Sequence, residues 1–589
     1  MSISERTLGG VALLAALFTL LAGCGEKEHA GAPIPLAEGE AAVHPTLAAH
    51  TPEFERKLYS VTEGVHVAVG FGLANSILVE GDECVFIVDT LGSVEAAQAV
   101  RAEFEAITDK PIAALIYTHN HADHILGARG FAPEGEIDVY AHETTNSYID
   151  RLISVLRPII GMRSERMFGN HLPKSGDDRL VNDGIGPALE AAHGGGTPSL
   201  IRPNRTFGDR LELTLCGVQL VLVHAPGETN DQLFVWLPEK RALLPGDNVY
   251  KAFPNLYTIR GTLYRDVLEW VRSVDAMRAL RPEHLVPSHT RPVSGAAEID
   301  EILTAYRDAI QFVHDQTIRG MNRGLTPDEI VETVELPPHL KQHPYLQELY
   351  GTVEWSVRSV YSGYLGWFDG DTATLSPASP EERAAGMVAL AGGEAGLLAA
   401  TRTAIAEGRY AWAAELASAL LRHDPGLDEA KRLKAQSLRV LGHRSVSPNG
   451  RNYYLTQALE LEGEVEVVVT EPTSAMLELA KAMPIANFIA AMPANLNPSL
   501  SADADTVMGF RFPDAGESFT IHVRRGVADF RTGFPEEPDV AITADSGAWV
   551  EVVAGARGLP AAIASGDIEV EGGLRKLPAA VAFLAMFRN

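Results

Sequence analysis

The stretch "IYTHNHADHILG", residues 116–127, places three histidines and one aspartate within six positions: His119, His121, Asp123 and His124. It directly follows the apolar run "PIAALIY", which predicts a buried strand. Loops at strand ends carry much of the chemistry of such sheets, so the four side chains can face one cleft. Neutral imidazole suits zinc and similar ions. We therefore expect a two-metal half-site, in which His119 and His121 bind one ion and Asp123 and His124 reach a second.

The composition of the chain limits the class of protein to which this half-site can belong. The chain has 589 residues, and at about 150 residues per domain it should form three or four domains. Hydrophobic residues at 46% and charged residues at 21% are typical of globular proteins. The net charge of −28 argues against a nucleic-acid surface, which needs clustered Lys and Arg. It does not exclude an anionic substrate, because a metal or an arginine can reverse the field inside a pocket.

The first 24 residues have the pattern of an export signal. The run "LGGVALLAALFTLLAGC" is too short for a membrane span, which needs about 20 apolar residues, and it ends in small residues. Its end resembles the lipobox of bacterial lipoproteins, which implies cleavage before Cys24 and a lipid anchor on it. The alternative is an ordinary cleaved signal with an incidental cysteine. Residues 25–57 read as a tether, and we expect an exported, periplasmic or outer-membrane-anchored lipoprotein.

Two further cysteines follow, Cys84 in "ECVFIVDT" and Cys216 in "LTLCGVQLVLV". Both runs are apolar and strand-like. We expect buried free thiols rather than a disulfide or a metal site.

Between residues 58 and 295, strand patterns alternate with helical spacing, which predicts an α/β domain. Three further candidate ligands each follow a predicted strand: Glu228 in "HAPGETNDQ", Asp247 in "LLPGDNVY" and His289 in "LVPSHTRP". The ordered set H-x-H-x-D-H, P-G-ligand, G-D and S-H resembles the metallo-β-lactamase superfamily.

That resemblance implies an αββα sandwich and two Zn²⁺ ions per chain. Asp247 would bridge the ions. Glu228 would complete the site of the first two motif histidines, and His289 the site of the motif aspartate and third histidine. Most of the superfamily has histidine at the position of Glu228, and a carboxylate there is harder and negatively charged.

Glu228 and the segment "NLYTIRG" after Asp247 resemble the zinc alkylsulfatases, which have the pattern N-L-Y-T-x-R-G. The match implies substrate-binding roles for Asn255, Tyr257 and Arg260. Asn255 and Arg260 would hold sulfate oxygens, because a guanidinium presents a planar fork of donors.

The same match implies catalytic roles for Asp123, Asp247 and Arg260. The chain also departs from the family pattern, which has glutamate where Asp247 stands and a histidine-bearing stretch where this chain has "YKAFP". Lys251 in that stretch changes the local charge, which bears on substrate identity.

The rest of the chain extends the resemblance. Residues 296–445 have helical spacing, with "LTPDEI" as a helix start, and resemble the alkylsulfatase dimerisation domain, which implies a homodimer. Its aromatic residues would form an alkyl-chain groove or, alternatively, helix-packing core and a dimer seam. Residues 455–589 resemble an α+β sterol-carrier-protein-like domain, which would either enclose a lipid chain or form an ordinary core.

The resemblance thus implies hydrolysis of alkyl sulfate esters to alcohol and sulfate by a metal-bound hydroxide. Two cations about 3.5–4 Å apart lower the pKa of a bound water toward about 7. The same centre acting on a phosphodiester, lactone or thioester is one alternative. A non-catalytic lipid-binding envelope protein is another.

Overall fold

The computed structural model describes residues 41–151, 157–188, 196–468 and 473–587. The predicted signal peptide with Cys24, and residues 25–40 of the predicted tether, lie outside the described residues.

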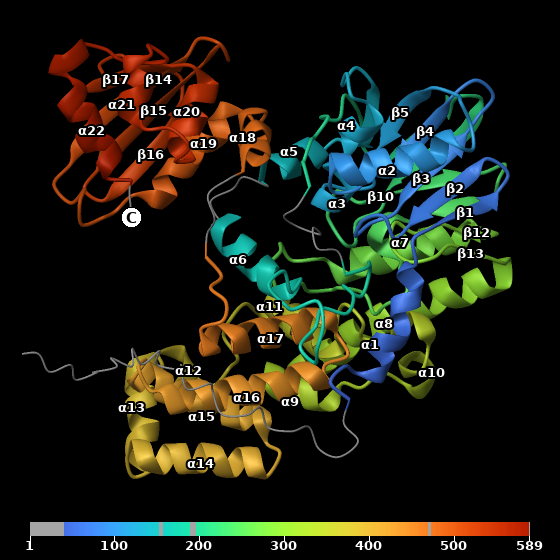
Figure 1. The fold of residues 1–589 in the computed structure, drawn as a ribbon, viewed down its shortest axis with the longest axis horizontal. Coiled ribbons are helices and arrows are strands. Elements are labelled where there is room, and N and C mark those ends of the chain that lie inside the picture. The colour runs from blue at the N-terminus through green and yellow to red at the C-terminus, as the bar shows by residue number, and fades with distance from the viewer. Residues whose placement is uncertain (1–40, 152–156, 189–195, 469–472, 588–589) are drawn as a thin grey trace, which may run out of the picture. The chain divides into compact units, whose positions relative to one another are not determined.

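Two β-sheets form the centre of the N-terminal half (Figure 1). The first has seven strands in sequential order: β1 (Lys57–Thr62), β2 (Val65–Val69), β3 (Ser76–Glu80), β4 (Val85–Val88), β5 (Ile112–Ile116), β6 (Asp138–His142) and β7 (Arg205–Phe207). Strands β1 to β4 pair antiparallel, whereas β4 to β7 pair parallel. The carboxyl ends of β4 and β5 therefore meet at one edge of the sheet.

The second sheet has the order β13-β12-β11-β10-β9-β8. Its strands are β8 (Arg210–Leu215), β9 (Val218–His224), β10 (Leu233–Leu237), β11 (Ala242–Leu244), β12 (His284–Leu285) and β13 (Val293–Ser294). All neighbours pair antiparallel except β11 and β12, which are parallel.

The two sheets pack face to face around one apolar core. Buried Val67 and Phe86 of the first sheet belong to the same cluster as Leu222 and Val235 of the second. Burial of these inner faces removes apolar surface from water and holds the sheets together.

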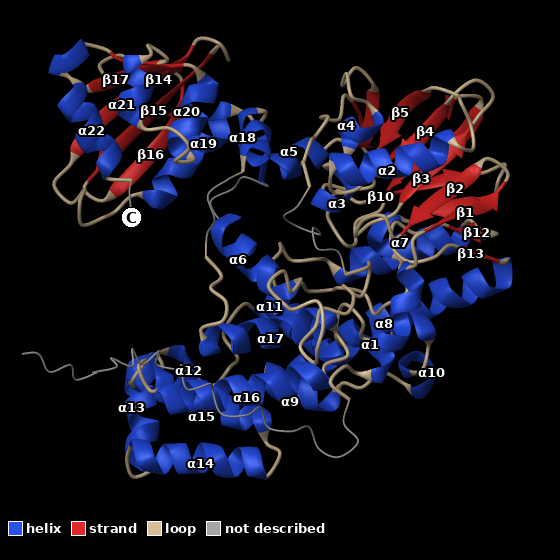
Figure 2. Ribbon diagram, viewed as in Figure 1, coloured by secondary structure: helices blue, strands red, loops and turns tan. Residues whose placement is uncertain are grey.

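Helices cover both outer faces (Figure 2). On the first sheet, Val100 and Phe104 of α2 (Val94–Glu105) join the outer core. On the second, α7 (Val267–Ala279) and α8 (Ala296–Asn322) form a cluster that continues into α11 (Val353–Leu365). The predicted αββα sandwich is confirmed.

A helical region follows the sandwich. Its helices after α8 are α9 (Pro327–Thr333), α10 (Pro338–Lys341), α11, α12 (Thr372–Leu375), α13 (Pro380–Leu390), α14 (Glu394–Ala406), α15 (Tyr410–His423), α16 (Asp428–Arg444) and α17 (Pro448–Glu462). The predicted helix start is present, because Thr326 and Glu329 form a capping box on α9.

The C-terminal part is a five-stranded sheet with helices, of order β16-β15-β14-β17-β18. The strands are β14 (Asp505–Phe512), β15 (Glu517–Arg524), β16 (Val527–Thr532), β17 (Val540–Ala544) and β18 (Ile568–Val570), and the helices α18 (Ser474–Lys481), α19 (Ile485–Ala491), α20 (Ser546–Val553), α21 (Leu559–Ala564) and α22 (Leu577–Ala585). Buried Phe519, Ile521 and Val523 alternate along β15, so one face of the sheet forms the core. The predicted α+β class is confirmed, and the predicted domain boundaries stay predictions.

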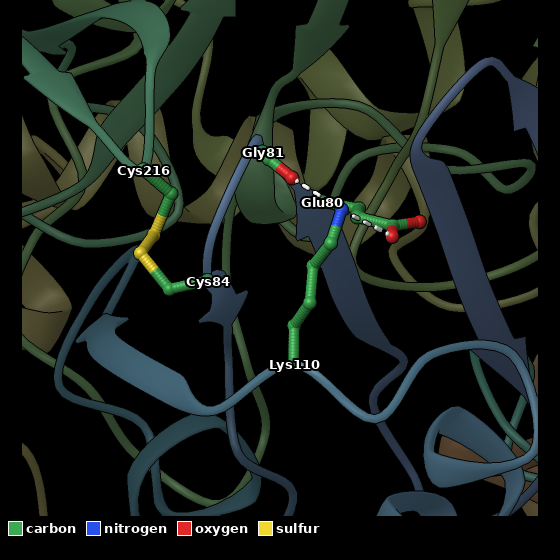
Figure 3. Close-up of a disulfide and its surroundings, with 5 residues drawn as sticks. All are labelled: Glu80, Gly81, Cys84, Lys110 and Cys216. Atoms are coloured by element: carbon green, nitrogen blue, oxygen red, sulfur yellow. Dashed lines mark hydrogen bonds and ion pairs between the residues drawn. A yellow bond between two sulfur atoms is a disulfide. The ribbon is translucent and has the colours of Figure 1, made fainter.

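The expectation for the cysteines is wrong, because Cys84 and Cys216 form a disulfide (Figure 3). Neither is fully buried. Cys216 lies in the tight turn between β8 and β9, where it has φ 54°, and Cys84 lies in the turn before β4. The Asp82 amide donates to the Cys216 carbonyl at 2.7 Å, which brings the two turns together. The flanking apolar runs belong to the strands, and the cysteines themselves lie just outside them.

In the described part of the chain, no single helix combines the length and apolar character that a membrane span requires. Two bent helix pairs reach that length and composition only when each pair is taken together: Pro380–Leu390 with Glu394–Ala406, and Ser474–Lys481 with Ile485–Asn495.

Candidate metal centre

The motif loop leaves β5 at its carboxyl end. His119 and His124 are fully buried, while His121 and Asp123 are half-buried. A one-turn helix, α3 (Ala122–Ile125), follows His121 and turns the second half of the motif back toward the sheet edge. The loop thereby aims side chains from both halves of the motif at one point.

Three loops of the second sheet reach the same point. Glu228 lies between β9 and β10, Asp247 lies in the 3-10 turn η3 (Gly246–Asn248) after β11, and His289 lies between β12 and β13. The turn before Asp247 requires glycine, because Gly246 has φ +59° and an added Cβ would lie 2.0 Å from the Gln232 amide nitrogen.

All seven predicted ligands are brought together by the structure. Their ligand atoms form three groups, each within 4.8 Å: His119, His124 and Asp247; Asp123, His124 and His289; and His121, Glu228 and Asp247. Asp247 belongs to two of these groups. Their role as metal ligands stays a prediction.

The carboxylate of Asp247 lies at the middle of the cluster. Its Oδ2 is 3.2 Å from His289 Nε2, 3.4 Å from His124 Nε2 and 3.5 Å from His119 Nε2. Asp123 Oδ2 lies 3.4 Å from His124 Nε2 and 3.6 Å from His289 Nε2. A buried carboxylate that lies against three imidazoles fits a metal cofactor.

Asp89, at the end of β4, holds the motif histidines. Its Oδ2 accepts hydrogen bonds from His124 Nδ1 at 2.8 Å, Thr118 Oγ1 at 2.9 Å and Ser288 Oγ at 2.7 Å. Because the Thr118 hydroxyl donates to Asp89, it accepts at 3.0 Å from His119 Nδ1. Both imidazoles therefore direct an Nδ1–H to an oxygen, which leaves Nε2 as the atom that can bind a metal ion.

His289 is oriented in the same way by backbone carbonyls. Its Nδ1 donates to the carbonyl oxygens of Leu73 at 2.9 Å and Ile185 at 3.1 Å. Its Nε2 is thus also left as the ligand atom.

The cluster attracts positive charge. Burial lowers the pKa of His119 to about 4, so its imidazole is neutral at pH 7. Burial also opposes a proton on His124, but Asp247 and Asp123 outweigh it and raise the pKa of His124. Among the described residues, His119 Nε2, His124 Nε2 and Asp247 Oδ1 are buried without a hydrogen-bond partner. Buried imidazole and carboxylate atoms without a partner fit a metal cofactor, which would replace the proton that the carboxylates favour on His124.

The predicted substrate residues lie on the loop between η3 and α7. Arg260 Nη2 is 3.4 Å from His121 Nε2, so the guanidinium borders the cluster. Asn255 is buried, and its Oδ1 has no hydrogen-bond partner among the described residues. Tyr257 is half-buried on the same loop and makes no hydrogen bond or ion pair with the cluster in the described structure. The structure thus brings Arg260, but not Tyr257, against the cluster.

Two charged residues that sequence reasoning missed contact predicted ligands. Arg265 Nη1 is 2.8 Å from Glu228 Oε1, and both side chains are buried. Asp89 is the other. The adjacent parallel strands β4 and β5 were a usable signal for Asp89, because residues following their carboxyl ends meet at one edge. For Arg265 the sequence holds no such signal.

Lys251 lies away from the cluster. Its ammonium pairs with Glu53 at 2.6 Å and lines a cavity of about 1000 Å³ to which none of the seven predicted ligands contributes. Its charge is therefore balanced locally.

Comparisons with known proteins identify the domains of the chain. The metallo-β-lactamase superfamily model matches residues 69–289, the alkyl sulfatase dimerisation model residues 326–464 and the alkyl sulfatase C-terminal model residues 473–589. The linear primary-alkylsulfatase of Pseudomonas sp. (strain ATCC 19151) is 41% identical over 83% of this chain and 95% of its own length. An (R)-specific secondary-alkylsulfatase from Pseudomonas sp. is 29% identical over 87% of this chain and 78% of its own.

Among solved structures, the stereoselective inverting sec-alkylsulfatase Pisa1 from Pseudomonas sp. aligns with TM-score 0.84 and 27% identity. The alignment covers 94% of this chain and 88% of that one. The chain therefore belongs to the alkylsulfatase family of metallo-β-lactamase-fold enzymes.

Proposed function

We propose that this chain is a dizinc alkylsulfatase that hydrolyses a linear primary alkyl sulfate to the alcohol and inorganic sulfate. The observation that carries the proposal is the convergence of the seven candidate ligands, with Asp247 at their centre and Arg260 at their border. The 41% identity to a linear primary-alkylsulfatase favours this substrate class.

His119, His121 and Glu228 would hold one ion, Asp123, His124 and His289 would hold the other, and Asp247 would contribute to both. Two zinc ions held there would supply an acidified water molecule and positive charge for the ester. Asp123 would hold one ion, and Asp247 would fix the position of the two relative to each other. Asp89 keeps the imidazoles of His119 and His124 in the tautomer that binds metal.

Arg260 is assigned the sulfate group, with Asn255 beside it on the same loop. A guanidinium donates two parallel hydrogen bonds to a tetrahedral oxyanion, so it binds the ester and turns its reacting bond toward the ions. Tyr257 is assigned a supporting contact from the same segment.

Metal removal tests the proposal. Dialysis against a chelator should abolish release of sulfate from dodecyl sulfate, and two equivalents of Zn²⁺ should restore it. Full activity after complete metal removal would contradict it. Fewer than one bound ion per purified chain, with no hydrolysis, would instead favour the lipid-binding alternative.

Arg260→Ala separates a sulfatase from a hydrolase of neutral esters. We expect KM for dodecyl sulfate to rise about 10- to 100-fold, since a hydrogen bond to a charged group contributes about 1.5–3 kcal/mol. Metal content should stay unchanged. A lactone or thioester substrate preferred by the wild type and unaffected by the change would move the function to that class.

A homodimer is the proposed assembly. It is supported by the match of residues 326–464 to an alkyl sulfatase dimerisation model and by apolar side chains exposed at the end of α11. These are Tyr364, Leu365 and Trp367, the last 74% exposed. Light scattering should give twice the chain mass, and Trp367→Asp should shift it toward the monomer.

Export with a lipid anchor on Cys24 stays a proposal. The disulfide between Cys84 and Cys216 supports export, because such bonds persist in oxidising compartments. Mass spectrometry of the mature protein should find a lipidated N-terminal Cys24, and Cys24→Ser should release the protein from the membrane fraction. Recovery of the wild type in the cytosol with an unprocessed N-terminus would contradict export.

A further inference from the structure

The pair formed by Glu228 and Arg265 is buried more deeply than most ion pairs of the chain. The side chains are 3% and 2% exposed, and Arg265 Nη1 lies 2.8 Å from Glu228 Oε1. The same nitrogen donates to the backbone carbonyl of Asn255. Arg265 directly precedes Asp266, whose side chain caps the start of α7, so its backbone is fixed by the helix end.

Glu228 is held at both ends. Its backbone amide donates to Asn248 Oδ1 at 3.2 Å, and Asn248 Nδ2 donates in turn to the Ala225 carbonyl at 2.7 Å. Gly227 allows this approach, because an added Cβ would lie 2.1 Å from Asn248 Oδ1. Arg265 then fixes Oε1 of the carboxylate, while Oε2 has a longer, 3.4 Å hydrogen bond from the Tyr250 hydroxyl. Oε1 is thus anchored by a charged partner, and the carboxylate has an oxygen within 4.8 Å of ligand atoms of His121 and Asp247.

Charge supplies the second part of the argument. The cluster has three carboxylates, Asp123, Glu228 and Asp247. Two divalent cations held by three carboxylates carry one net positive charge, and the substrate to be attracted is an anion. Arg265 cancels the charge of Glu228 and restores the field that a neutral ligand would leave.

We propose that Arg265 is a positioning residue for Glu228: it anchors Oε1 and cancels the carboxylate charge, so that Glu228 acts at the metal centre as an effectively neutral ligand. This inference rests on the proposed function, because it takes Glu228 as a ligand. It follows that the side-chain charge at position 265 must cancel the side-chain charge at position 228.

We test this cancellation of charge by substituting residues 228 and 265 singly and together and measuring the bound metal. Glu228→His alone places a neutral ligand beside a buried, unpaired guanidinium that repels the adjacent dication. We expect it to retain one metal equivalent after brief chelator treatment and to lose the second at least ten times faster than the wild type. The double variant Glu228→His with Arg265→Met should regain two equivalents, because both positions are then neutral.

Arg265 alone is tested in the Glu228 background. Arg265→Met should keep both metal equivalents but raise KM for dodecyl sulfate about tenfold and weaken inhibition by inorganic sulfate equally, since one positive charge is lost. Arg265→Lys should bring both values back to within about threefold of the wild type. Arg272→Met is the matched control, because Arg272 lies on the exposed side of α7 and pairs with Glu269. Melting curves of each metal-free variant establish that it folds.

Equal metal retention by Glu228→His and by the double variant, whether both are full or both deficient, would overturn the inference. Loss of metal by a folded Arg265→Met variant would overturn it as well, because a Glu228 carboxylate without its paired charge should attract the cations at least as strongly. A wild type that binds no metal would instead overturn the proposed function, so the two failures are distinguishable.

Discussion

Strands β4 and β9 each run from the disulfide to the metal centre. β4 begins after Cys84 and ends before Asp89, and β9 begins after Cys216 and ends ahead of Glu228. β4 belongs to the first sheet and β9 to the second, and the two ends of this pair of strands differ in chemistry. At the first end a covalent bond ties the sheets together, and at the second end buried charged side chains from both sheets meet.

The difference separates stability from function. Buried carboxylates and imidazoles without a cation destabilise the folded state, because each loses its hydration. A disulfide stabilises the folded state mainly by restricting the unfolded chain. The disulfide therefore offsets part of the destabilisation caused by the buried charged groups at the metal end. Substitutions at the disulfide end should change stability, and substitutions at the metal end should change activity.

The largest expected effect is at the metal end. Asp247→Ala removes the carboxylate that lies 3.2–3.5 Å from three imidazoles. Sulfate release should fall at least about a thousandfold, with loss of bound zinc, because both proposed ions lose a ligand.

The control is Asp82→Ala at the disulfide end, where an exposed aspartate contributes its backbone amide to the turn. Its activity and zinc content should equal those of the wild type. Retention of both zinc ions by Asp247→Ala would remove Asp247 from the proposed centre.

The second effect is on stability alone. Replacing Cys84 and Cys216 by serine opens a cross-link between residues 132 positions apart, which should lower the free energy of unfolding by about 3–4 kcal/mol. Activity at 25 °C should stay within twofold of the wild type, because the bond lies at the far ends of β4 and β9. Urea unfolding with and without reductant measures the first quantity, and loss of zinc in the folded double variant would show that the ends are coupled.

The two ends also differ in how far the sequence predicts them. The motif histidines and Asp123 lie in six consecutive positions, so their proximity requires only one loop. Glu228, Asp247 and His289 are scattered, and only the order of short patterns in a family resemblance placed them. Their convergence could not follow from local spacing, because it depends on how the second sheet packs on the first.

The missed residues share a physical reason. An aspartate that ends a strand, such as Asp89, has many possible partners, and an arginine before a helix, such as Arg265, usually faces solvent. For Cys84 and Cys216, apolar neighbours indicated burial, but Cys216 lies in the tight turn between β8 and β9, and Cys84 lies in the turn before β4. The sandwich was predictable because alternating apolar runs determine it, whereas pairings across 132 positions were not.

A smaller effect than disulfide loss is expected at Asp89, where the metal end depends on one carboxylate outside the ligand set. Asp89→Asn keeps the size of the side chain but weakens its bonds to His124 Nδ1 and to Thr118. Zinc affinity should fall about 10- to 100-fold, as is usual for such outer partners, and the free energy of unfolding of the zinc-loaded protein should fall by the corresponding amount, about 1.4–2.7 kcal/mol. Competition with a fluorescent chelator measures it, and an unchanged affinity would mean that the histidines hold their tautomers without Asp89.

The smallest effect is expected beside the disulfide, at Lys110. Its ammonium pairs with Glu80 at 2.9 Å and donates to the Gly81 carbonyl at 2.8 Å, but both charged side chains are partly exposed (Figure 3). Partly exposed ion pairs contribute about 0–1 kcal/mol, so Lys110→Met should lower the free energy of unfolding by less than about 1 kcal/mol. Zinc content and activity should not change. If Lys110→Met instead released zinc, loss of a surface contact at one end of β4 would change metal binding at the other end. The two ends would then be coupled, even through a partly exposed ion pair.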